Sequence, residues 1–180
     1  MLVGMAACAG VPGADPPATD VTSPPPLNAP PGVPPPSPLP LPPSPEELRA
    51  EDTAQNAALA AEHFVALMNY AHSTGDVAPL QEISAPTCTP CHTFIADVED
   101  LYGDGGYAVG NVVSLGEHAA SRMDDGTWRV TVDWNLSDGV RVPTDGETIV
   151  LEPMTLPGQR IAVELREGAW RYLDFDGPSD

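Results

Sequence analysis

The chain has 180 residues, 26 of them acidic and 7 of them basic, and a formal net charge of −19 at pH 7. Every basic residue is arginine, so there is no lysine for a Schiff base or for a Walker-type phosphate loop. So negative a surface repels nucleic acids and anionic membranes. No apolar run reaches about 18 residues. We therefore expect no nucleic-acid partner, and attachment to a membrane only through a lipid.

Residues 1–8 resemble the end of a bacterial signal peptide with its lipobox. Small residues precede a cysteine in Met5-Ala6-Ala7-Cys8, the pattern in which that cysteine is acylated and becomes the mature N-terminus. Met5 stands where leucine is usual, and no basic segment precedes it, so either the start lies upstream or the match is accidental. Lipidation of Cys8 leaves Cys88 and Cys91 as an even pair, as an oxidising compartment favours. We expect an exported protein, anchored by lipid on the outer face of the cell membrane.

Residues 9–45 are rich in proline and hold sixteen of the 23 prolines in the chain. Proline fixes φ, removes a hydrogen-bond donor and keeps the preceding residue extended, so neither a helix nor a sheet is expected here. The segment is predicted to be a disordered tether with polyproline II character, which could reach roughly 90 Å at about 3 Å per residue. An SH3-type ligand is disfavoured because basic residues are missing beside the PxxP spacings.

The helical pattern begins at the end of the tether. Ser44 can act as N-cap, Pro45 fits the first helical position, and Glu47 completes a capping box. Apolar residues then recur at helical spacing as far as Gly75, a typical C-terminal glycine. One long amphipathic helix is therefore predicted.

Two shorter helices are predicted next. Asp76 can cap the first of them, and Thr87 begins the second, which the glycine-rich segment 103–106 ends. The apolar face of the last helix has helical spacing; it comprises Cys91, Phe94, Ile95, Val98, Leu101 and Tyr102.

From residue 107 the period changes to two. Apolar residues alternate with polar ones between Trp128 and Leu136, which predicts a half-buried strand. Other strands are predicted over residues 107–115, 149–154, 161–165 and 170–173. Helices followed by meandering strands predict an α+β fold, with three N-terminal helices packed on one face of a curved antiparallel sheet of four to five strands.

This order resembles the NTF2-like (SnoaL-like) cone. The strings over residues 64–76 and 83–91, with the glycine segment 102–110, resemble a family of uncharacterised actinobacterial secreted lipoproteins. The resemblance covers about residues 46–174 and leaves the tether out, and the predicted NTF2-like domain comprises residues 46–176. It implies secretion, a lipid anchor and an NTF2-like fold, and it implies no activity.

Cys88 and Cys91 stand at i and i+3 at the start of a predicted helix. This spacing suits a local disulfide, and it also serves redox enzymes because a helix N-terminus stabilises a thiolate. No βαβ context surrounds the pair, as a thioredoxin-like site would require. We expect a structural disulfide.

The same segment, Cys88-Thr89-Pro90-Cys91-His92, also matches the attachment motif of c-type haem. His92 would then be one axial ligand, and Met68, Met123 or Met154 the other. The strand-rich second half argues against the small helical domain usual for such proteins. Zinc would lack a fourth ligand, and we expect no metal and no cofactor.

The mouth of an NTF2-like cone can form a pocket. Its possible lining comprises Phe64, Tyr70, Trp128, Trp134, Trp170 and Tyr172, although we favour the interpretation that the strand aromatics fill the cone as core. Candidate acid–base groups inside the cone are Asp133, His63, Tyr70 and His118, although Asp133 alternates with the tryptophans and should face outward.

These observations favour a surface-anchored domain without catalysis that binds a protein or a small apolar ligand in the cell envelope. Two alternatives remain open at this point. One is an enzyme of the isomerase or hydratase kind that uses a carboxylate or a histidine in the cone. The other is a c-type haem protein. The identity of the partner is not predicted.

Overall fold

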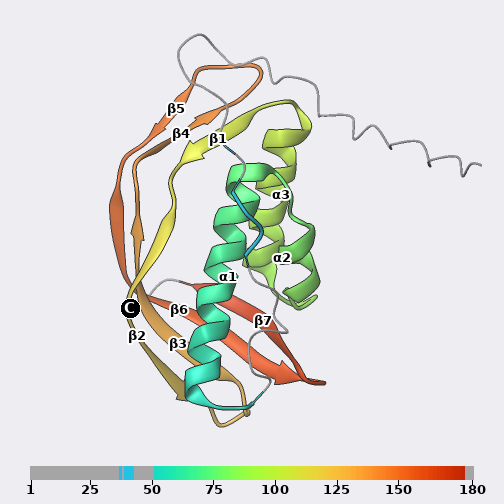
Figure 1. The fold of residues 1–180 in the computed structure, drawn as a ribbon, viewed down its shortest axis with the longest axis vertical. Helices are drawn as coiled ribbons and strands as arrows, with labels where there is room; N and C mark the ends of the chain where they lie inside the picture. The colour runs from blue at the N-terminus through green and yellow to red at the C-terminus, as the bar shows by residue number, and fades with distance from the viewer. Residues whose placement is uncertain (1–36, 38, 43–50, 177–180) are drawn as a thin grey trace, which may run out of the picture.

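The computed structural model describes residues 37, 39–42 and 51–176 (Figure 1). The described part is α+β, with helices packed on antiparallel sheets, as the sequence predicts. Its helices are α1 (Ala54–Thr74), α2 (Ala78–Ile83) and α3 (Thr89–Gly103). Its strands are β1 (Tyr107–Gly110), β2 (Val113–Arg122), β3 (Trp128–Leu136), β4 (Gly139–Val142), β5 (Ile149–Leu151), β6 (Met154–Arg166) and β7 (Ala169–Asp176).

Helix α1 begins later than predicted. Its N-cap is Thr53, whose Oγ1 accepts a hydrogen bond from the backbone N–H of Asn56 at 3.2 Å. The predicted cap at residues 44–47 lies outside the described residues, but residues 51–53 are not helical, so a helix running on from that cap is wrong. The predicted end is confirmed: Gly75 has a φ of 78° and donates its N–H to the carbonyl of Ala71.

The next two helices also start at local caps. Asp76 Oδ1 accepts a hydrogen bond from the N–H of Ala78 at 3.1 Å, so Asp76 caps α2 as predicted, although Val77 holds the formal N-cap position. Helix α3 begins at Thr89, and its N-cap is Cys88 rather than Thr87. The Cys88 sulfur accepts a hydrogen bond from the N–H of Cys91.

The strands form two antiparallel sheets. In the described residues, four strands follow the order β2-β3-β6-β7 and three follow the order β1-β4-β5. Because β1 leads into β2, β3 into β4 and β5 into β6, the smaller sheet continues the larger one across a bend, with the helices on its inner side (Figure 1). The bend passes through Gly110 and Asn111, which both have positive φ, and the N–H of Asn111 donates to the carbonyl of Asp138.

A single sheet of four to five strands is therefore a wrong prediction for the described residues. The segment 107–115 is predicted to be one strand, but the left-handed backbone at Gly110 and Asn111 divides it. The segment 149–154 is also divided, because Pro153 between β5 and β6 has no N–H for a ladder.

Aromatic side chains fill the space between the helices and the larger sheet. The ring of Phe64 on α1 stacks on Tyr172 of β7 with centroids 4.5 Å apart, and Phe175 lies 5.5 Å from Phe64 and 5.7 Å from Trp134. The Tyr172 hydroxyl donates to the carbonyl of Ala60. This cluster ties α1 to the edge strand β7 and to the inner strand β3.

The described end of the proline-rich segment contacts the helices. Leu41 and Pro42 line a small pocket of about 160 Å³ together with His63, Leu67 and Ile83. Leu41 is 58% exposed, whereas Pro42 is half-buried. The domain therefore has contacts N-terminal to the boundary predicted at residue 46.

Candidate functional site

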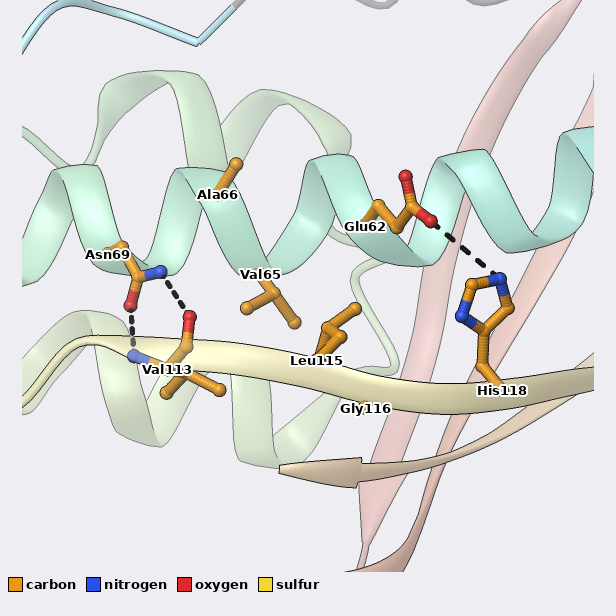
Figure 2. Close-up of a pocket in the computed structure, with 8 residues that line it drawn as sticks. All are labelled: Glu62, Val65, Ala66, Asn69, Val113, Leu115, Gly116 and His118. Atoms are coloured by element: carbon orange, nitrogen blue, oxygen red, sulfur yellow. Dashed lines mark hydrogen bonds and ion pairs between the residues drawn. The ribbon is translucent and has the colours of Figure 1, made fainter. Parts of the chain in front are cut away.

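An open groove lies between α1 and β2, the edge strand of the larger sheet (Figure 2). Its volume is about 300 Å³. Apolar side chains from both walls line the middle of the groove. Polar side chains stand at its two ends, Asn69 at one end and Glu62 with His118 at the other. The lining residues are Glu62, Val65, Ala66, Asn69, Val113, Leu115, Gly116 and His118.

Asn69 closes one end of the groove. Its Nδ2 donates to the carbonyl of Val113 at 2.8 Å, and its Oδ1 accepts from the N–H of Val113 at 2.9 Å (Figure 2). The side-chain amide thus makes the two bonds that a neighbouring strand would make at this position. It fixes the spacing between α1 and β2 and covers this part of the sheet edge.

A β-bulge places His118 in the groove. Leu115 is opposite Trp134 and His118 is opposite Val132, so three residue steps on β2 match two on β3. Side chains alternate across a regular strand, so residues three apart would face opposite ways; the bulge restores the helix-facing side for His118. Figure 2 shows the Leu115 and His118 side chains both directed toward α1.

His118 and Glu62 form the polar end of the groove. The His118 Nε2 atom lies 3.7 Å from Glu62 Oε1, and the two side chains are 31% and 46% exposed. A pair so open to water gains little from its mutual attraction. The carboxylate is therefore available to a cationic or hydrogen-bond-donating group that enters the groove.

Most of the predicted pocket residues lie in the core. Phe64, Trp128, Trp134, Trp170 and Tyr172 are each at most 8% exposed and belong to the main apolar cluster. Tyr70 is half-buried and donates its hydroxyl to Asp76 Oδ2 at 2.9 Å. The α1–β2 groove is lined by other residues.

The predicted acid–base candidates lie apart. Asp133 is exposed on β3, as its alternation predicts, and its Oδ1 accepts from the N–H of Gly158. His118 enters the groove, where its neighbour Glu62 was not predicted as a site residue. The signal that could have found the pair is Gly116, because a glycine inside a strand often marks a bulge.

His63 is buried, with 6% of its surface exposed, and no described residue hydrogen-bonds to its Nε2. Burial lowers the pKa of this imidazole below its usual 6.5. The unfolded chain then binds a proton more readily than the folded one. Stability is therefore full above about pH 6.5 and is lost as the pH falls through the lowered pKa of the folded state.

We expect the substitution His63→Phe to reduce the decrease in the free energy of unfolding that acidification causes. The free energy of unfolding, measured with urea at pH 7.5 and at pH 5, should differ less in the variant than in the native chain. His92→Phe is the control, because His92 is exposed on α3. His72, whose pKa is lowered by burial and by Arg141, should maintain a residual slope. If His63→Phe leaves the pH dependence of the free energy of unfolding unchanged, His63 is not its cause.

Cys88 and Cys91 are joined in a disulfide, with their Cα atoms 5.3 Å apart and both residues at most 1% exposed. His92, the histidine that ends the haem-attachment motif, is exposed. Of the candidate axial ligands, Met68 is buried and Met154 is 51% exposed. Cys8 lies outside the described residues.

In the part of the chain that the structure describes, no three His, Cys, Asp or Glu side chains come together as metal ligands would. No helix there combines the length and the apolar character that a bilayer crossing requires.

Comparison with solved structures gives several matches at low identity. The intermembrane-space region of the chloroplast protein ARC6 has a TM-score of 0.48 at 14% identity and covers 71% of this chain and 98% of its own. Aln2 from a Streptomyces species scores 0.45 at 13% identity, covering 68% and 90%. An uncharacterised Caulobacter vibrioides protein with a cystatin-like fold scores 0.44 at 15% identity, covering 67% and 87%. Likenesses of this size carry no functional argument.

Comparison with known sequences gives one family. No curated protein matches the chain. Residues 34–176 match DUF6318, a family of unknown function. The match includes the proline-rich residues 34–45 as well as the α+β domain. The chain belongs to the DUF6318 family.

Proposed function

We propose that this chain is a binding protein without catalysis, with an NTF2-like domain held at the outer face of the cell membrane by a lipid on Cys8 and a proline-rich spacer. The α1–β2 groove is its ligand site. Its ligand is a small molecule with an apolar body and a cationic end. The observation that carries this proposal is an open apolar groove with a solvent-exposed carboxylate at one end.

The packing supports binding rather than catalysis. Aromatic side chains occupy the interior, where an NTF2-like enzyme would need a substrate cavity. Among the described residues, the buried polar side chains are Asn56, His63 and Ser84, none of them a carboxylate. An acid–base catalyst needs a shielded group with a shifted pKa, whereas Glu62 is 46% exposed.

The charge of the chain supports a cationic ligand end. Val65, Ala66, Val113 and Leu115 offer apolar contact to the body of the ligand. A net charge of −19 raises the local concentration of cations and repels anions. The ligand cation would contact the Glu62 carboxylate, and its apolar body would extend toward Asn69.

Binding of hexylammonium and hexanoate to the full chain tests this proposal by amide NMR titration. We expect hexylammonium to shift the amides of Val65, Val113 and Leu115, and hexanoate to leave them unchanged. Ala66→Trp should fill the groove and abolish the shifts, whereas Ala119→Trp, on the opposite face of β2, should preserve them. Glu62→Gln should weaken binding about two- to fivefold, the range expected for an exposed ion pair, and Glu117→Gln should not.

Two results would reject the proposal. One is equal binding of hexanoate and hexylammonium. The other is binding that Ala66→Trp leaves intact, because the ligand would then lie elsewhere on the protein.

A further inference from the structure

The outer edge of the smaller sheet is apolar and unprotected. β5 is last in the order β1-β4-β5, so no described strand pairs with its far side. Ile149 is 52% exposed and Val150 65% exposed. Edge strands of natural proteins usually carry a charge, a proline or a bulge, because their free peptide groups can pair with another chain. The three residues of β5, Ile-Val-Leu, include none of these.

The exposed apolar surface extends beyond this edge. Six large apolar residues are exposed in the described part of the chain, and four of them lie in β5 or beside the bend: Val112, Ile149, Val150 and Met154. Val150 is opposite Val140, which is opposite Val109, so the three valines form a row on one face of the sheet. They line a pocket of about 540 Å³ that also reaches Leu151. A cluster of this kind marks an interaction site.

The rim of this surface is acidic. Asp138 and Glu152 line the pocket, and Asp145 and Glu147 are exposed in the loop that leads into β5. The one basic residue of this region is Arg141, which lies near His72 of α1 and lowers the pKa of that histidine. A second copy of this chain would bring the same acidic rim and the same net charge of −19. Charge complementarity therefore selects a basic partner.

We propose that the β5 edge is a docking strand for an extended segment of another protein, in which apolar residues alternate with polar ones and arginine or lysine stands at both ends. The segment adds an antiparallel strand beside β5, so that main-chain hydrogen bonds supply affinity. An apolar side chain of the segment opposite Val150 continues the valine row across the sheet, and the next apolar side chain, two residues along, lies on the same face. The basic ends contact Glu147 and Glu152. This surface is separate from the α1–β2 groove.

Two peptides test the proposal on the full chain: Arg-Thr-Val-Thr-Val-Thr-Arg and the same sequence with glutamate at both ends. We expect the arginine peptide to shift the amides of residues 149–151 and to slow their hydrogen exchange. Its affinity should fall as salt is raised, because screening weakens exposed charge pairs. The glutamate peptide should not bind. Equal binding of both peptides, or shifts confined to another surface, would overturn the proposal.

The variant Val150→Asp separates strand docking from simple charge attraction. It adds a negative charge, so charge alone predicts tighter binding of the arginine peptide. Loss of the apolar contact and of strand propensity predicts binding weaker by about tenfold. Thr131→Asp, an exposed position on the central strand β3, adds the same charge elsewhere and should leave the affinity nearly unchanged. Tighter binding by Val150→Asp would overturn the proposal.

A second variant serves if Val150→Asp fails to fold. The double substitution Glu147→Gln and Glu152→Gln preserves the apolar surface, and it should weaken the arginine peptide and reduce the salt dependence. Light scattering tests whether a second copy of this chain, rather than another protein, occupies the β5 edge. A stable dimer of the free chain that either variant converts to a monomer would identify a second copy as the occupant and overturn the proposal.

Discussion

Replacing Phe64 by alanine should lower the free energy of unfolding by about 3–5 kcal/mol, the usual cost of removing a buried aromatic ring. Phe64 is 1% exposed, and its ring stacks on Tyr172 at 4.5 Å and contacts Phe175 at 5.5 Å. The truncation removes contacts with two aromatic rings of β7 at once and leaves a cavity that a rigid helix–sheet interface cannot close. Urea denaturation of the native chain and the variant measures the difference.

Two further variants show whether the stack is the cause. Phe94→Ala makes the same change on α3, where the ring is only half-buried, and it should cost clearly less. Tyr172→Phe preserves the stacked ring and removes only the hydroxyl that bonds the Ala60 carbonyl, so its cost should be about 1 kcal/mol. A cost for Phe64→Ala no greater than that of Phe94→Ala would mean that the aromatic cluster does not hold the two layers together.

The regular parts of the fold were predictable because their periodicity is strong. The strand at β3 alternates without interruption, and the structure buries its apolar residues Trp128, Val130, Val132 and Trp134 while exposing the polar ones between them. The end of α1 was equally clear, because only a residue that adopts a left-handed backbone fits there. Gly75 does so, and a side chain at that position would meet the ring of Tyr102 at 2.6 Å.

The start of α1 and the division of the sheet were not predictable in the same way. Two sequences can cap the helix, one at Ser44 and one at Thr53, and local pattern alone does not decide between equivalent caps. The bend depends on the approach of Gly110 and Asn111 to Asp138, which lies in the distant connection between β3 and β4. This is a tertiary contact between distant segments, so the local sequence pattern at either residue does not predict it.

The candidate site was hidden for a related reason. His118 is a candidate on sequence grounds, but its pairing with Glu62 is not, because the two belong to a strand and a helix that are far apart in the sequence. Alternation counted from Leu115 also places His118 on the wrong face. The single extra residue of the bulge reverses that face. Apart from Tyr70, the aromatic residues named as possible pocket lining lie in the core. Apolar periodicity left both possibilities open, because it identifies a buried face and does not distinguish a filled interior from a hollow one.

Asn69→Ala should lower the free energy of unfolding by about 2 kcal/mol, because it leaves two half-buried peptide groups without partners. The N–H and the carbonyl of Val113 both bond to this side chain. Amide hydrogen exchange at Val113 should accelerate by a larger factor than exchange at β3, since the lost bonds belong to the sheet edge. Asn135→Ala is the matched control, because Asn135 is exposed and its Oδ1 accepts a bond only from the Thr155 side chain among the described residues.

Asn69→Asp distinguishes the two bonds from each other. A carboxylate still accepts from the N–H of Val113 but repels the carbonyl that Asn69 Nδ2 serves. At neutral pH this variant should therefore be no more stable than Asn69→Ala. Protonation below about pH 4 restores a donor, so the deficit relative to the native chain should shrink as the pH falls. A deficit that grows with acidification would mean that the Val113 carbonyl has another donor, and that the α1–β2 spacing does not depend on Asn69.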